Sequence, residues 1–178
     1  MVARRATASE VPLLRSLNSE SAKHWRVWLS AYAPILLWVG VIFYLSSDNG
    51  SSVQTSRFIR PLLEFLFPGA PPTTIDLYHF YIRKAAHFTE YAILSLVLAR
   101  AFIKVRAGFR YWPFAAVGIV ALVAAGDEIN QSLEASRTAS PYDSLLDIVG
   151  GSVAAFVLWL LLKRASTRQQ PPVEQAQG

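Results

Sequence analysis

The stretch "IRKAAHFTEYAILSLVLARAF", residues 82–102, joins two unlike halves. Its second half is typical of a membrane helix, whereas its first nine residues contain four ionisable side chains, Arg83, Lys84, His87 and Glu90. An ionisable group in hydrocarbon costs roughly several kcal/mol unless it meets a partner or water. The stretch therefore predicts a membrane helix that turns these four groups toward other polar residues.

Three further apolar runs surround this one. The four runs occupy residues 27–46, 80–103, 112–132 and 143–162, and each has about the 20 residues that a membrane-spanning helix needs. Of the 178 residues, 53% are hydrophobic and 16% are charged, which is more apolar than soluble domains usually are. The sequence predicts an all-α polytopic membrane protein built as a four-transmembrane-helix bundle.

The first apolar run, near the N-terminus, is long for a cleaved signal peptide. A polar leader of 26 residues precedes it and no Ala-x-Ala-like site follows it, so we expect a retained anchor. The membrane domain is then residues 25–163, between a polar N-terminal tail (1–24) and a C-terminal tail (164–178). We expect both tails to be disordered, because they are short, polar and poor in aromatic side chains.

The first outer loop, residues 47–79, has an apolar segment of its own. Residues 53–67 are apolar enough to lie on the membrane but too short to cross it, which predicts an interfacial helix. We expect Pro61 to limit this helix and the Pro-Gly-Ala-Pro-Pro run at 68–72 to end it. A cover over the bundle is favoured over a lid that contacts substrate.

Positive charge is distributed unevenly between the two ends of the bundle. Twelve of the 17 Lys and Arg residues lie on the side of both termini, and five lie on the other side. The positive-inside rule then predicts that the N- and C-termini are both cytoplasmic. The chain has no cysteine, which excludes disulfides and Cys-ligated metal sites.

Polar residues of the last three spans fall at one depth, in the outer half of the bundle, by helical rise. Asp127 and Gln131 share a helix face, as do Asp143 and Asp147, because each pair is four residues apart. We expect these groups to point into the bundle. The small residues that should allow close helix packing there are Gly150, Gly151, Ala154, Ala155, Ala121, Ala125 and Gly126.

Eleven side chains make up the predicted site. The candidates for catalysis are His87, Glu90, Glu128 and Asp143. The candidates for substrate binding are Arg83, Lys84, Tyr91, Asp127, Gln131, Arg137 and Asp147. Polar pairs between membrane helices are often only structural, worth about 0.6 kcal/mol each, but so many in one layer favour a functional site. Ser46, Ser47 and Ser140 are interpreted as interfacial capping groups rather than nucleophiles.

The order and spacing of these residues resemble the VanZ-like family of bacterial membrane proteins. The matching elements are Lys84-x-x-His87-Phe88-x-Glu90-Tyr91, Asp127-Glu128-x-x-Gln131, Arg137, and Asp143 with Gly150. The departures are Asp147 where the family usually has Asn, Asn130 where His is common, and Ala135-Ser136 where Pro-Gly often precedes the arginine. The resemblance implies a four-span bundle in the bacterial cytoplasmic (inner) membrane and a link to teicoplanin resistance.

Three interpretations of the function stay open. In the first, an outward-facing pocket binds or modifies a cell-envelope lipid headgroup or cell-wall precursor, because Arg83, Lys84 and Arg137 suit phosphate or carboxylate groups. In the second, the carboxylates and His87 serve a hydrolase or transferase that acts on a lipid-linked substrate, with or without a divalent cation. The third is a small transporter, disfavoured because the inner halves of the predicted spans lack polar groups. The bilayer is the expected partner and nucleic acid is not; the sequence leaves the cofactor and oligomeric state undefined.

Overall fold

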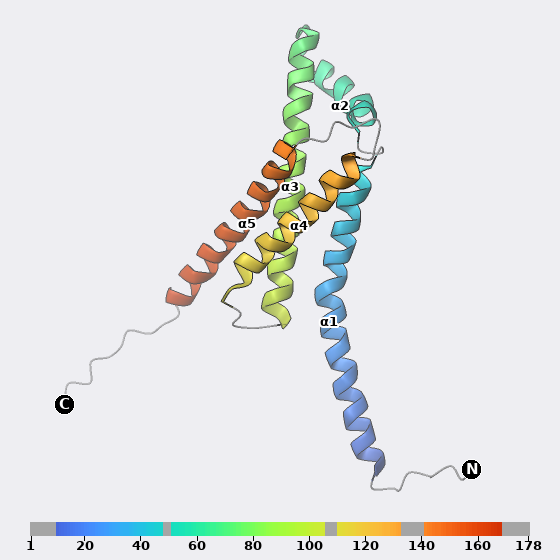
Figure 1. Ribbon diagram of the computed structural model, residues 1–178, viewed down its shortest axis with the longest axis vertical. Helices are drawn as coiled ribbons and strands as arrows, with labels where there is room; N and C mark the ends of the chain where they lie inside the picture. The colour runs from blue at the N-terminus through green and yellow to red at the C-terminus, as the bar shows by residue number, and fades with distance from the viewer. Residues whose placement is uncertain (1–9, 48–50, 106–109, 133–140, 169–178) are drawn as a thin grey trace, which may run out of the picture.

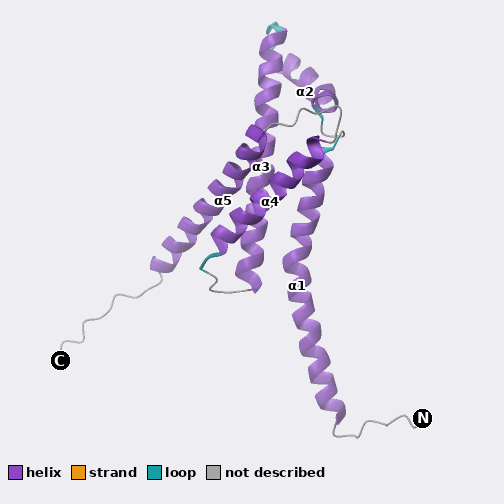
Figure 2. Ribbon diagram, in the orientation of Figure 1, coloured by secondary structure: helices purple, strands orange, loops and turns teal. Residues whose placement is uncertain are grey.

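The computed structural model describes residues 10–47, 51–105, 110–132 and 141–168, and this part of the chain is all helical, as predicted. Figure 2 shows helices and short loops, with no strand among the described residues. The helices are α1 (Glu10–Ser46), α2 (Ser52–Leu66), α3 (Pro72–Val105), α4 (Trp112–Ser132) and α5 (Pro141–Arg168).

Helix α3 lies at the centre of the molecule and contacts each of the other four helices. α1 and α4 run in one direction, and α3 and α5 run in the opposite direction (Figure 1). The first described turn of α1 and the last turn of α5 therefore lie at the same end of the bundle. At the other end, α2 and the first turns of α3 project beyond the remaining helices as a helical hairpin (Figure 1).

Three helices are long and apolar enough to cross a membrane, as judged over the described residues. These segments are Trp25–Ser46 in α1, Trp112–Ser132 in α4 and Tyr142–Arg168 in α5. Large apolar side chains such as Leu36, Leu37 and Leu122 are exposed on them, as lipid-facing residues are. The fourth predicted span, residues 80–103, lies within α3, whose polar first half lowers its mean hydropathy. The chain is thus an all-helical membrane protein with three spans supported by length and composition.

Several predicted boundaries are wrong. α1 already begins at Glu10, so residues 10–24 are helical rather than disordered, because a helix that is once formed propagates cheaply through residues with good helix propensity. α5 likewise continues to Arg168, past the predicted start of the C-terminal tail at residue 164. Residues 1–9 and 169–178 lie outside the described part of the chain.

The outer loop is also more helical than expected. α2 continues through Pro61, which removes one backbone hydrogen bond without breaking this short helix. α3 begins at Pro72 rather than near residue 80, because proline suits the first helical turn, where its missing N–H has no partner to lose. Between the two helices, Gly69 adopts φ +85°, a conformation open to glycine, and the predicted end of α2 at the Pro-Gly run is correct.

An apolar core fills the bundle below the polar layer. Leu94 and Leu98 of α3, Val120 of α4 and Ala155 of α5 are buried against one another. α1 is fastened to α3 at both ends of this core. The Trp38 indole N–H donates to the Glu90 carbonyl oxygen at 2.9 Å, and Lys104 Nζ donates to Ser30 Oγ at 2.7 Å.

Candidate functional site

A buried polar cluster joins α3, α4 and α5 in the half of the bundle nearest α2. His87 comes from α3, Asp127 from α4 and Asp147 from α5, and one ligand atom of each lies within 4.8 Å of the other two. Asp127 is 1% exposed and Asp147 is 2% exposed. Three helices thus deliver an imidazole and two carboxylates to one point. The sequence predicted that these groups share a depth, but not which of them meet.

Glycines on α5 allow this close approach. A Cβ atom added at Gly150 would lie 2.4 Å from the carbonyl oxygen of Phe88, the residue after His87. One added at Gly151 would lie 2.7 Å from a Val120 side-chain carbon. α5 therefore packs directly against the α3 backbone and against α4 beside the cluster. Of the other predicted small residues, Ala155 is buried but Ala125 is exposed; the buried alanines of α4 are Ala116 and Ala124.

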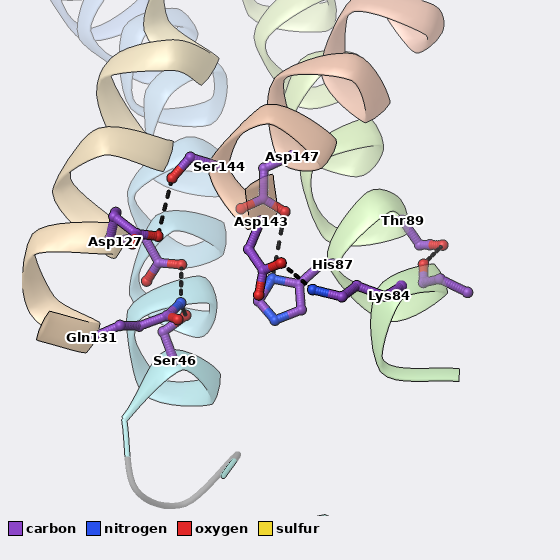
Figure 3. Close-up of polar contacts among 11 residues, drawn as sticks. Ser46, Lys84, His87, Thr89, Asp127, Gln131, Asp143, Ser144 and Asp147 are labelled. Carbon is purple, nitrogen blue, oxygen red and sulfur yellow. Dashed lines mark hydrogen bonds and ion pairs between the residues drawn. The ribbon is translucent and has the colours of Figure 1, made fainter. Parts of the chain in front are cut away.

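Asp127 is held by its own helix and by α1. Gln131 Nε2 donates to Asp127 Oδ2 at 2.9 Å and lies 3.4 Å from Ser46 Oγ (Figure 3). Ser46 is buried, so its interpretation as an interfacial cap is wrong, whereas Ser47 does bond locally to the Tyr44 carbonyl. The Gln131 amide orients one carboxylate oxygen of Asp127 and leaves the other facing the cluster.

His87 and Asp147 face each other without a well-formed hydrogen bond. His87 Nδ1 lies 3.4 Å from Asp147 Oδ1 (Figure 3), but the geometry leaves both atoms without a hydrogen-bond partner. The buried polar side-chain atoms of the described residues that lack such a partner are His87 Nδ1, Tyr91 Oη, Ser95 Oγ, Asp127 Oδ1 and Asp147 Oδ1. Such atoms are rare in folded proteins, because each costs about 1–3 kcal/mol.

The remaining acids lie around the cluster. Asp143, in the first turn of α5, forms an ion pair with Lys84 (Figure 3). Ser144 Oγ donates to Glu128 Oε2 at 3.2 Å, which links α5 to α4 beside the cluster. These contacts fix the helices relative to one another, and Glu128 is not among the three clustered ligands.

A small cavity of about 100 Å³ opens between α1, α2 and α3. Its polar wall consists of Ser46, Thr55, Arg83, His87 and Glu90. Arg83 Nη1 donates to Thr55 Oγ1 at 3.2 Å, so α2 helps to hold the guanidinium at the cavity. Because His87 both lines the cavity and belongs to the cluster, it connects the two.

Above the cavity, His79 Nε2 lies 3.3 Å from the same Thr55 hydroxyl. Partial burial, and next the positive charge of Arg83, lower the pKa of His79. The lowered pKa disfavours a second positive charge beside Arg83, whose guanidinium lies in the same cavity wall as the Glu90 carboxylate.

The sequence interpretation named the main cluster residues but missed several of their neighbours. Arg137 and Ser140 lie outside the described residues. Thr55, Ser95 and Ser144 were not anticipated, although Ser95 follows Tyr91 by four residues and so lies on the same face of α3. Thr55 and Ser144 had no such signal, because their contacts depend on how helices pack.

Comparison with known proteins gives one match. The family model described as VanZ/LLP1 matches residues 31–163, a range that contains α2, α3 and α4, the C-terminal part of α1 and most of α5. No curated protein and no solved structure matches the chain. The matched range includes every candidate residue of the site. On this match, together with the ordered polar elements on α3, α4 and α5, the chain belongs to the VanZ/LLP1 family.

Proposed function

We propose that the chain crosses the bacterial cytoplasmic (inner) membrane four times, with α3 as the fourth span. α1 ends at one end of the bundle and α4 begins at the opposite end (Figure 1). Two helices can cross in the same direction only if the chain returns between them, and α3 makes that return. The excess of Lys and Arg at the end that carries both termini supports a cytoplasmic location for them.

We propose next that the site binds the anionic headgroup of a cell-envelope lipid or cell-wall precursor. The observation that carries this proposal is the cavity between α1, α2 and α3, with Arg83 and His87 in its wall. Its volume of about 100 Å³ equals that of about three liquid water molecules, which suits one phosphate or carboxylate group. Arg binds such groups in a bidentate manner, and the rest of a lipid would extend along the helices.

An enzymatic role is the second candidate, favoured by the contact between His87 Nδ1 and the buried Asp147. A carboxylate beside an imidazole can hold the ring and stabilise its charged form, while the opposite ring nitrogen transfers a proton. A headgroup in the cavity would meet His87 directly. Hydrolysis or transfer on a lipid-linked substrate is the reaction class that fits this arrangement. Transport is less well supported, because the buried residues below the layer are mainly apolar.

Binding is tested with the purified full-length chain in detergent, titrated with phosphatidylglycerol and, for comparison, neutral phosphatidylcholine. We expect Arg83→Gln to weaken phosphatidylglycerol binding about tenfold, as the loss of one charge-assisted contact would. The matched control is Arg57→Gln, because Arg57 is exposed on α2 and outside the cavity. Equal effects of the two variants, or equal binding of both lipids, would refute the proposal.

The link to glycopeptides is tested in a teicoplanin-sensitive Gram-positive host at matched membrane levels of each protein. We expect the unaltered chain to raise the teicoplanin concentration needed to stop growth, and Arg83→Gln to lose this effect while Arg57→Gln keeps it. Vancomycin is run in parallel. If no form protects, the resistance role fails and the lipid-binding result stands separately.

A further inference from the structure

We propose that His87, Asp127 and Asp147 bind a divalent transition-metal ion of the Zn²⁺ or Mn²⁺ class. One imidazole and two carboxylates are a donor set that both ions accept. Ligands about 2.0–2.2 Å from a common ion lie about 3.4 Å apart when they are tetrahedral neighbours. His87 Nδ1 and Asp147 Oδ1 are separated by that distance, 3.4 Å. The full set lies within 4.8 Å, so the widest pair would have to close by at most about 1.4 Å to reach that spacing.

Unpartnered buried atoms point independently to a ligand. Asp127 and Asp147 are more than nine-tenths buried, and each has one oxygen without a hydrogen-bond partner. His87 Nδ1 is a third such atom. A single cation among the three residues would satisfy all of these atoms at once. A purely structural cluster would instead be expected to join them by hydrogen bonds.

Charge balance supports the same conclusion. Two buried carboxylates close together repel each other strongly where water is scarce. Lys84, the cation that the sequence places one turn before His87, is engaged by Asp143. A divalent ion would neutralise both carboxylates of the cluster.

The surroundings are arranged as they are in established metal sites. Gln131 Nε2 donates to Asp127 Oδ2, which orients the carboxylate from behind, as outer partners of metal ligands do. The Tyr91 hydroxyl is also buried and lacks a hydrogen-bond partner. His87 also lines the cavity between α1, α2 and α3, so an ion bound to it would lie beside that cavity. The metal site does not depend on the lipid proposal.

The test is metal binding by the purified full-length chain, stripped with EDTA and kept free of added lipid. Zn²⁺ is titrated calorimetrically, and Co²⁺ serves as a spectroscopic substitute whose visible absorption reports nitrogen and oxygen coordination. We expect one ion per chain and a loss of affinity of about 100-fold or more in His87→Gln and in Asp127→Asn. The matched control is Glu128→Gln, which removes the same charge one residue along α4 and should retain affinity within about twofold.

Circular dichroism and size-exclusion chromatography check that each variant is folded. If Asp127→Asn does not fold, the metal affinity of His87→Gln tests the proposal. The proposal is overturned if the unaltered chain takes up no stoichiometric Zn²⁺ or Mn²⁺. It is also overturned if folded His87→Gln binds as tightly as the unaltered chain, or if Glu128→Gln loses as much affinity as Asp127→Asn. The metal titration is done without lipid and the phosphatidylglycerol titration without added metal, so failure of either proposal leaves the other to be decided by its own measurement.

Discussion

At the scale of single residues, the site depends on glycines as well as on polar side chains. The hydrogen side chain of Gly150 lets α5 touch the Phe88 carbonyl, and this contact sets the separation between His87 on α3 and Asp147 on α5. The polar residues supply the chemistry, whereas the glycines determine whether their atoms can meet. Gly150 should therefore tolerate substitution poorly, even though alanine is the better helix former.

We predict that Gly150→Ala destabilises the protein by about 1–3 kcal/mol, because its Cβ would collide with the backbone rather than with a movable side chain. Gly118→Ala is the matched control on α4, where nothing lies within 4 Å of the added carbon. Thermal unfolding in detergent, followed by circular dichroism, should give a lower Tm for the first variant only. A Tm equal to that of the unaltered chain would mean that α3 and α5 separate easily.

At the scale of elements, α2 is unusual because it packs with one face and exposes the other. On the packed face, Leu63 is buried. Arg60 Nη1 pairs with Asp76 Oδ1 of α3 at 2.9 Å. The exposed face carries the large apolar side chains Phe58, Leu62, Phe65 and Leu66. Such a face is costly in water, and we propose that it rests in the membrane interface.

The chain lacks cysteine, so a single introduced cysteine can carry a spin label without background. We predict that a label at Phe58→Cys, a position 79% exposed, is accessible to oxygen dissolved in lipid and shielded from a water-soluble nickel complex. A label at Thr73→Cys, exposed at the start of α3, should show the opposite preference. The same aqueous accessibility at both positions would place α2 away from the bilayer.

At the scale of the whole molecule, the direction in which each helix runs says more about the number of spans than its composition does. Composition alone does not identify α3 as a span, because polar residues in its first half lower its hydropathy. The parallel course of α1 and α4 nevertheless requires a return crossing between them (Figure 1). Helix α3, the one long helix of the described residues that composition does not identify as a span, is thus the helix that contacts all the others.

This topology predicts the sidedness of two introduced cysteines. In intact cells, an impermeant maleimide should label Thr73→Cys at the α2–α3 end and should label Ser166→Cys, near the end of α5, only after lysis. The reversed pattern would invert the orientation. Labelling of both positions in intact cells would contradict the three crossings, by α3, α4 and α5, that separate them.

By itself, the sequence determined the helical class, the membrane setting and the depth of the polar layer, because hydropathy and a rise of 1.5 Å per residue are local properties. It also named His87, Asp127 and Asp147, since ionisable residues within apolar runs are visible without a structure. Only the tertiary structure decided which of the acids meet. It grouped Asp127 with Asp147, paired Asp143 with Lys84 and turned Glu128 to Ser144. That sorting depends on helix rotation and close approach at Gly150 and Gly151, which arise from packing between distant segments.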